Sequence, residues 1–532
     1  MLVLRKSLTI KKTIVFMLFA IVFGAVFSVS HKLIGEGRIY INIIEVFGTG
    51  IIIFLILMIL WEIIQREENK EIDVIAPLRK KEILAIFLLS VGINIICLLT
   101  YYPGVGMNDG LNIMYYGMSQ AQQFPVFYCI GLTILKKVGI VLGSLQYSVA
   151  IYSILQIICV SALYTWIYVW FSKKQTPKIM KWLVLLYFLL EPLLAMYAIS
   201  MLKDTLFSLF LFVLVLLLYD LIIEKNNNDM GKMWWIFFAV ILFGILSFRN
   251  NGSYIVFPIL LILIICCTNN RKKILFMIMF SLLVVVLQKL LMIHFGAEQL
   301  FQEIVAIPLQ QMAAVVANNG KITVDQQNFL SQLMPLNEMI SKYNPGTVDT
   351  LKWDGMFNRT FLNEHKIEFL ETWAGMLVNN FTIYVKAYLQ QTFWFWAPCQ
   401  EGVVQCFYSI ETVVNNTWLT DFLVASGIHD QPLLPEVLDN ILKVWYGWGN
   451  KFVREGVCFW IMLGSLLLSV MKNKTWKMLV VYAPMLLLWL TIMISTPVAS
   501  SMRYVFVFAY ALPFFLGVLF IKNQCQDDIE KE

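Results

Sequence analysis

Long apolar runs recur along the whole chain and restrict its possible folds more than any other feature. A helix needs about 20 apolar residues to cross a bilayer core about 30 Å thick, and twelve runs approach that length. Apolar residues make up 59% of the chain and charged residues 14%, against roughly 45–50% and 25% in soluble domains. We therefore expect an all-α polytopic membrane protein with about twelve transmembrane helices. The runs lie near residues 13–30, 41–64, 83–100, 144–171, 182–200, 205–223, 234–248, 253–268, 274–293, 455–471, 478–498 and 504–521.

Positive charges alternate between the predicted loops and indicate the orientation of the chain. Cytoplasmic loops are enriched in Lys and Arg. With a cytoplasmic N-terminus, the basic clusters at 79–81, 173–181, 271–273 and 472–477 all fall on the cytoplasmic side, and the opposite short loops carry far fewer basic residues. We expect a multi-pass protein of the cell membrane with both termini in the cytoplasm. No basic stripe interleaved with aromatic residues occurs, so nucleic acid is not an expected partner.

Two long outer loops divide the chain into three parts. Residues 1–295 are expected to form a membrane domain with about nine helices and a long first outer loop at 101–143. In that loop, residues 125–138 are apolar but too short to span, which favours an interfacial helix. Residues 296–451 hold polar stretches, Pro and Gly, and are expected to form a mostly helical extracytoplasmic domain. Residues 452–532 contain the last membrane helices.

Charged residues that are far apart in the sequence reach the same predicted membrane face. Ionisable groups at membrane depth are costly and often functional. Cations there suit a lipid phosphate, which Arg binds bidentately, and a neighbouring carboxylate can act as a general base or hold a metal ion. These residues are Asp109, Lys203, Asp204, Arg249, Arg503 and Tyr504.

Each of these residues also has an ordinary structural interpretation. Lys203 and Asp204 can form an ion pair that closes a turn, and Arg249 and Arg503 can extend to lipid headgroups as anchors. Asp109 precedes Gly110 in a common turn dipeptide. Glu191 immediately precedes Pro192, where it is either a partner at a helix kink or a contact for an acceptor.

The nine cysteines show no metal-ligand spacing. The sequence leaves open whether a divalent metal takes part. It also leaves open whether Cys399 and Cys406 in the large loop form a disulfide or two free thiols.

Several short motifs follow one another in an order that resembles the C-type integral membrane glycosyltransferases (the GT-C fold), in a poorly characterised bacterial branch. The likeness extends from about residue 100 to the last helix. The chain departs from the pattern in that the loop that bears the aspartate does not follow the first helix, and in having Phe124 where His is expected. The motifs are Tyr102-Pro103-Gly104, Asp109, Pro125, Lys203-Asp204, Arg249-Asn250-Asn251-Gly252, Pro308-Leu309-Gln310-Gln311 and Arg503-Tyr504.

This resemblance implies a GT-C-like fold and a glycosyltransferase that moves a sugar from a polyprenyl-phosphate donor to a cell-envelope glycan or glycolipid on the outer face. Asp109 would deprotonate the acceptor hydroxyl. Arg249, Arg503 and Lys203 would bind the donor phosphate. The supporting residues would be Asp204, Asn250, Asn251, Tyr504, Glu191, Gln310 and Gln311.

Two other functions remain as alternatives. A transporter or flippase of lipid-linked oligosaccharides commonly has binding groups near the midplane and related halves, whereas this chain has few midplane charges and no evident repeat. A polymerase of lipid-linked oligosaccharides uses the same chemistry, and the sequence does not separate it from a transferase. The sequence identifies neither the sugar nor the acceptor.

Overall fold

Helices make up the regular structure of this chain. The computed structural model shows isolated β-bridges but no strand among the residues it describes. The described residues are 9–70, 78–174, 176–224, 230–298, 300–400 and 417–522.

Eight helices in the described part of the chain are long and apolar enough to cross a membrane. Their apolar composition follows the runs in the sequence, and many of their apolar side chains remain exposed because lipid is the solvent around them. The predicted all-helical class with helices of membrane-spanning length is therefore confirmed. The eight are α2 (Ile10–Glu36), α3 (Ile43–Glu68), α4 (Lys80–Thr100), α7 (Gln146–Lys173), α10 (Lys203–Tyr219, extended to Glu224), α13 (Arg271–His294), α26 (Glu455–Asn473) and α27 (Lys477–Ser495).

Four of the twelve predicted runs form shorter or broken helices. One is a pair, α8 (Lys178–Leu190) and α9 (Pro192–Ile199), that is bent by 47°. Pro192 has no backbone N–H to continue α8, and Glu191 caps α9 by accepting a hydrogen bond from the backbone N–H of Leu193 at 3.4 Å. The other three are α11 (Lys232–Phe248), α12 (Ser253–Cys266) and α28 (Val507–Gly517).

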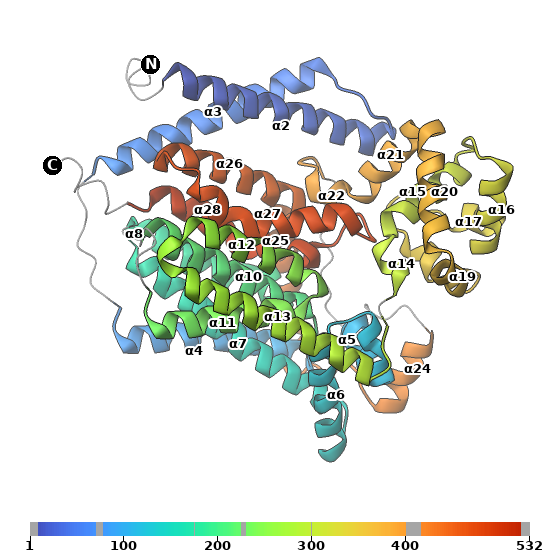
Figure 1. Cartoon of the computed structure of the whole chain (residues 1–532). Helices are drawn as coiled ribbons and strands as arrows, with labels where there is room; N and C mark the ends of the chain where they lie inside the picture. The colour runs from blue at the N-terminus through green and yellow to red at the C-terminus, as the bar shows by residue number, and fades with distance from the viewer. Residues whose placement is uncertain are drawn as a thin grey trace.

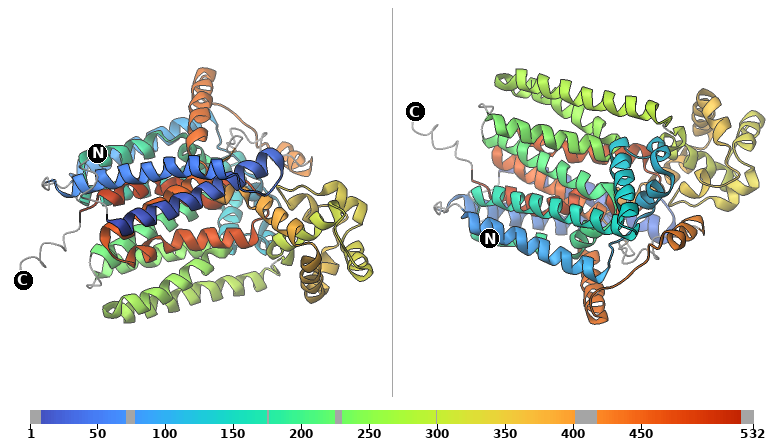
Figure 2. Two further views of the ribbon diagram at one scale, coloured as in Figure 1. Left: turned by 90° about the horizontal axis from the view of Figure 1, so that it is seen from above. Right: turned by 90° about the horizontal axis from the view of Figure 1, so that it is seen from below.

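The bundle has two distinct ends. Figure 1 shows α2 beginning and α28 ending at one of them, and the domain formed by α14 to α20 lying at the other. Figure 2 shows α2 and α3 side by side along the bundle, with α13 forming an outer edge of it. α13 packs against α11 and α12 on one side only, so its other side is exposed.

A separate apolar cluster forms the domain at the far end, which we call the loop domain (residues 301–391). Leu309, Phe329 and Phe369 are buried in this cluster, which is distinct from the core of the bundle. Lys352, 1% exposed, lies 2.8 Å from Glu303 Oε2 within it. Its helices are α14 (Phe301–Ile304), α15 (Ala306–Ala317), α16 (Val324–Leu333), α17 (Leu336–Lys342), α18 (Asp349–Lys352), α19 (Arg359–Glu364), α20 (Lys366–Asn379) and α21 (Phe381–Gln391).

Shorter helices between the loop domain and α26 return to the bundle. α22 (Phe393–Trp396) packs on α26, α24 (Thr417–Ser426) contacts α5 (Asn108–Tyr116), and α25 (Glu436–Phe452) packs on α9 and α4. The predicted interfacial segment forms α6 (Val126–Val141), which lies across the long axis of the bundle (Figures 1 and 2). The region predicted as one domain at 296–451 thus contains the loop domain followed by helices that pack against the bundle.

Backbone hydrogen bonds join the loop domain to the segment 496–499, which precedes α28. The backbone N–H of Val348 donates to Pro497 O at 3.0 Å, and that of Ala499 donates to Gly346 O at 2.7 Å. The side chain of Gln391 donates to Thr496 O at 2.8 Å. The loop domain therefore holds the chain immediately before Arg503.

The loop domain and the basic clusters lie at opposite ends of the bundle, so the orientation of the protein in the membrane can be tested. We expect a membrane-impermeant maleimide to label Gln332→Cys, in the loop domain, in intact cells, and to label Lys81→Cys, at the opposite end, only after permeabilisation. Both residues are exposed, so accessibility depends on the side of the membrane. Labelling of the unsubstituted protein measures the background from native cysteines. The reverse pattern would contradict the predicted orientation.

Candidate functional site

Asp109 lies in the first turn of α5, beside the chain that leads into α10. The backbone N–H of Val105 donates to Ile199 O at 3.1 Å, and that of Met201 donates to Val105 O at 2.9 Å. These two hydrogen bonds pair the loop before α5 with the turn before α10. Asp109 and Lys203, which begins α10, are consequently held close together.

Two glycines permit this close approach of the loop to the turn. Gly104 has a φ of 107°, and a Cβ there would lie 2.9 Å from Ile199 O and would collide with Ser153. A Cβ at Gly110 would collide with the side chain of Met201. The Tyr-Pro-Gly and Asp-Gly motifs of the sequence therefore serve the contact between these segments.

The carboxylate of Asp109 is bound by two cations. Lys203 Nζ lies 2.6 Å from Asp109 Oδ2, and Arg503 Nη1 donates to the same oxygen at 3.2 Å. The side chains of Asp109 and Lys203 are 17% and 12% exposed, and that of Arg503 is 26% exposed. Arg503 Nη2 also donates to the hydroxyl of Tyr504 at 3.2 Å. This group is thus mostly buried, with Arg503 as its most accessible member.

A second ion pair lies deeper at the same end of the bundle. Arg249 Nε lies 3.3 Å from Asp204 Oδ1, and the Asp204 side chain is 1% exposed. Arg249 Nη1 donates to the backbone carbonyl of Tyr504 at 2.9 Å. Its guanidinium also lies 5.3 Å from the ring of Phe207 and 5.1 Å from that of Tyr504. Arg249 therefore holds the backbone next to Arg503.

These six residues form the Asp109 cluster: Asp109, Lys203, Asp204, Arg249, Arg503 and Tyr504. Its three cations exceed its two carboxylates, so the cluster attracts an anion. Burial alone would raise the pKa of Asp109, but the charges of Lys203 and Arg503 outweigh burial and hold that pKa well below its ordinary value. Asp109 is therefore a carboxylate at neutral pH.

The two asparagines after Arg249 connect neighbouring elements and do not contact Asp109 in the described structure. Asn250 Nδ2 donates to Gln123 O at 3.3 Å, just before α6. Asn251 Nδ2 donates to Thr491 Oγ1 of α27 at 3.1 Å. They hold the turn that carries Arg249.

Three other predicted residues lie in different surroundings. Glu191 stands at the break between α8 and α9. Gln310 Nε2 donates to Asn344 O at 2.5 Å, inside the loop domain. Gln311 accepts a hydrogen bond from the Trp373 indole N–H at 2.8 Å, also in that domain.

Sequence reasoning missed several residues around the cluster. Gln156 Nε2 lies 2.7–3.0 Å from the carbonyl oxygens of Tyr197, Ala198 and Ser200, and so supports the turn before Lys203. An amide within the apolar run 144–171 was the available signal. The ring of Phe124, which the sequence analysis did name, lies 4.6 Å from Lys203 Nζ.

Asn108 and Asn112 were also missed, although both flank Asp109 in the sequence. Their amide oxygens are buried and accept no hydrogen bond in the described part of the chain. Asn112 follows Asp109 by three residues on α5 and therefore shares its helix face.

The described residues contain no group of three or more His, Cys, Asp or Glu that could hold a metal ion. Both carboxylates of the Asp109 cluster are paired with cations and do not converge as a ligand set. We therefore derive no metal-dependent step. Cys406 lies outside the described residues, so its pairing with Cys399 stays open.

The buried pair of Asp204 and Arg249 generates a stability prediction. Asp204→Asn leaves the buried guanidinium without its counter-charge, so we expect a loss of roughly 3–5 kcal/mol in the free energy of unfolding. The double variant Asp204→Asn, Arg249→Gln should lose less than the sum of the two single variants, which unfolding in mixed detergent would measure. Arg79→Gln, in an exposed ion pair with Glu82, is the control and should change little. Additive losses would argue against coupling.

The lowered pKa of Asp109 predicts a pH dependence. A carboxylate whose pKa is lower in the folded state stabilises the protein fully above its unfolded pKa of about 3.9. That contribution falls as pH drops toward the folded pKa, which lies well below the ordinary value. The difference in thermal midpoint between the unsubstituted protein and Asp109→Asn should stay constant from about pH 5 to 8 and shrink below about pH 4. A difference that grows toward acid would contradict the ion pairing.

Comparison with known proteins assigns the chain to a family. A family model matches residues 122–532, well over half of the chain, and that range contains Lys203, Asp204, Arg249 and Arg503 but not Asp109. No curated protein and no solved structure matched the chain. The chain belongs to DUF6020, a family of unknown function.

Proposed function

We propose that this chain is a membrane glycosyltransferase that moves a sugar from a polyprenyl-phosphate donor to a cell-envelope glycan or glycolipid acceptor. The observation that carries the proposal is the carboxylate of Asp109, bound by Lys203 and Arg503 at the end of a membrane-length bundle. A carboxylate next to phosphate-binding cations is what this transfer requires, because one group must take a proton while others stabilise a leaving phosphate.

The proposed reaction is a single displacement. The acceptor oxygen bonds to the anomeric carbon, and the bond from that carbon to the phosphate oxygen breaks with its electron pair going to the polyprenyl phosphate. The acceptor proton moves to Asp109. Attack opposite the leaving group inverts the configuration at the anomeric carbon. Lys203 and Arg503 neutralise the charge that develops on the leaving phosphate.

The ion pairs also supply a reason for Asp109 to become a base only with donor bound. In the unliganded cluster its pKa lies well below the ordinary value, so it is a weak proton acceptor. A donor phosphate competes for Lys203 and Arg503 and draws their charge away from the carboxylate. Burial then acts with less opposition and raises the pKa of Asp109, which strengthens the base.

The remaining residues of the cluster position these groups. Arg249 holds the Tyr504 carbonyl and is itself held by Asp204, so it fixes the turn that presents Arg503. The amide oxygens of Asn108 and Asn112 have no donor in the described structure and are suited to sugar hydroxyls. We therefore assign phosphate binding chiefly to Arg503 and Lys203, and a positioning role to Arg249.

We further propose a GT-C-like fold in which α11, α12, α28 and the bent pair α8 and α9 complete about twelve spans. The Asp109 cluster and the loop domain then lie outside the cytoplasm. The basic clusters lie at the opposite end, as the enrichment of cytoplasmic loops in Lys and Arg requires.

One observation favours the alternative of a transporter for lipid-linked oligosaccharides. The pair α8 and α9 is bent by 47° with Glu191 at the break, and transporters place ligand groups at broken helices. In that case Glu191→Gln should abolish function and Asp109→Asn should leave transport intact. A polymerase shares the proposed chemistry, and the chain-length distribution of the product separates it from a transferase.

The test is the envelope glycan profile, by mass spectrometry, of a strain that carries Asp109→Asn at normal protein level. We expect a defined sugar mass to disappear, because removing a general base slows transfer on the order of 10²–10⁴-fold. Asp325→Asn, on the loop-domain helix α16, is the matched control and should leave the profile unchanged. An unchanged profile in Asp109→Asn would overturn the proposal.

A further inference from the structure

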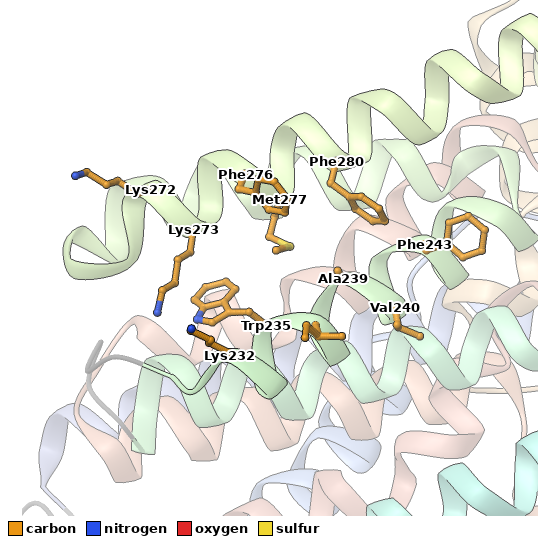
Figure 3. Close-up of a pocket in the computed structure, with 11 residues that line it drawn as sticks. Lys232, Trp235, Ala239, Val240, Phe243, Lys272, Lys273, Phe276, Met277 and Phe280 are labelled. Carbon is orange, nitrogen blue, oxygen red and sulfur yellow. The ribbon is translucent and has the colours of Figure 1, made fainter.

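An apolar groove of about 670 Å³ lies between α11 and α13. Figure 3 shows its walls, which are formed by side chains of these two helices. α11 extends from Lys232 at one mouth of the groove to Phe248 beside Arg249, so its 17 residues place that mouth about 25 Å from Arg249 at a rise of about 1.5 Å per residue. The apolar lining consists of Ile236, Ala239, Val240, Phe243, Phe276, Met277 and Phe280.

Polar groups gather at one mouth of the groove. Lys232 begins α11 and Lys273 lies in the first turn of α13. In Figure 3 their ammonium groups and the indole nitrogen of Trp235 lie toward one another, whereas Lys272 extends away. Lys273 Nζ donates to Met230 O at 3.3 Å and lies 5.8 Å from the Trp235 ring. The mouth thus combines two cations with an N–H donor.

Trp235 supplies an independent sign of a ligand. Its side chain is 5% exposed, and its indole N–H has no hydrogen-bond partner in the described part of the chain. A buried donor without an acceptor is unfavourable. An anionic oxygen between Lys232 and Lys273 would provide the missing acceptor.

The charged residues that line the groove favour an anionic ligand. All charged residues that line the groove in the described structure are lysines. Volumes of roughly 300–1,000 Å³ are typical of sites for small organic ligands, and basic pockets between membrane helices bind anionic lipid headgroups. A molecule with a phosphate at the mouth and a hydrocarbon chain along Phe243 and Phe280 fits both parts.

We propose that this groove binds one anionic phospholipid of the bilayer, with its phosphate on Lys232, Lys273 and the Trp235 indole N–H and an acyl chain between α11 and α13. The bound lipid would lie between two helices of which one, α11, ends beside Arg249 and the other, α13, leads into the loop domain. This site does not depend on the glycosyltransferase proposal.

The test is native mass spectrometry of the purified full-length protein after exchange into detergent that contains phosphatidylglycerol or phosphatidylcholine. We expect at least tenfold preferential retention of one phosphatidylglycerol. Lys232→Gln with Lys273→Gln should reduce that retention at least tenfold, and Trp235→Phe should reduce it severalfold.

Lys81→Gln is the control for charge at the same end of the bundle. Trp234→Phe is the control for the indole, because its N–H is also buried without a partner but does not line the groove.

Ala239→Phe separates a built site from general attraction of anionic lipid, because it fills the groove without changing charge. Loss of phosphatidylglycerol in this variant is expected, with a thermal midpoint near that of the parent as evidence of folding. Equal retention of both lipids, or retention unaffected by Ala239→Phe or by the lysine substitutions, would overturn the proposal. Displacement of phosphatidylglycerol by equimolar polyprenyl phosphate would overturn it in favour of a donor-lipid site.

Discussion

The carboxylate of Asp109 joins three parts of the chain, and the arrangement of the whole far end of the bundle depends on it. Its partners Lys203 and Arg503 stand 94 and 394 residues away in the sequence. A single oxygen, Oδ2, accepts from both. Because these contacts are mostly buried, each partner must be placed closely by its own helix. Hydrogen bonds between Val105 and the turn before Lys203 provide one placement, and Arg249 beside Arg503 provides another.

The loop domain contributes to the same arrangement from outside the bundle. Its hydrogen bonds to residues 496–499 hold the chain just before Arg503. A movement of the loop domain relative to the bundle would therefore displace the most accessible cation of the Asp109 cluster. This connection gives the domain a physical role in the proposed transfer, because an acceptor that contacts the loop domain would alter the position of a phosphate-binding residue. The buried pair of Asp204 and Arg249 resists such displacement on the bundle side.

The two ends of the bundle present different chemistry to the membrane. The Asp109 cluster combines carboxylates with cations, so a phosphate bound there would change the pKa of a neighbouring acid. The charged residues in the described lining of the groove between α11 and α13 are lysines, which would hold a phosphate bound there. α11 connects the two because it begins at Lys232 and ends beside Arg249. A lipid that fixes this helix at one end would help to fix Arg249 at the other.

Hydropathy and the alternation of basic loops were enough to predict the all-helical membrane class and to bring Asp109, Lys203, Arg249 and Arg503 to one end. Hydropathy locates the membrane crossings, and each crossing assigns the following loop to one side. Tertiary packing determines which of these residues are in contact, since hydropathy does not define how a helix is rotated about its axis or which helices are neighbours. It thus placed Gln310 and Gln311 inside the loop domain and Glu191 at a helix break. It also brought Gln156 against the turn before Lys203 and Lys232 beside Lys273. Such contacts arise from packing between distant segments, which a linear pattern of apolar residues does not encode.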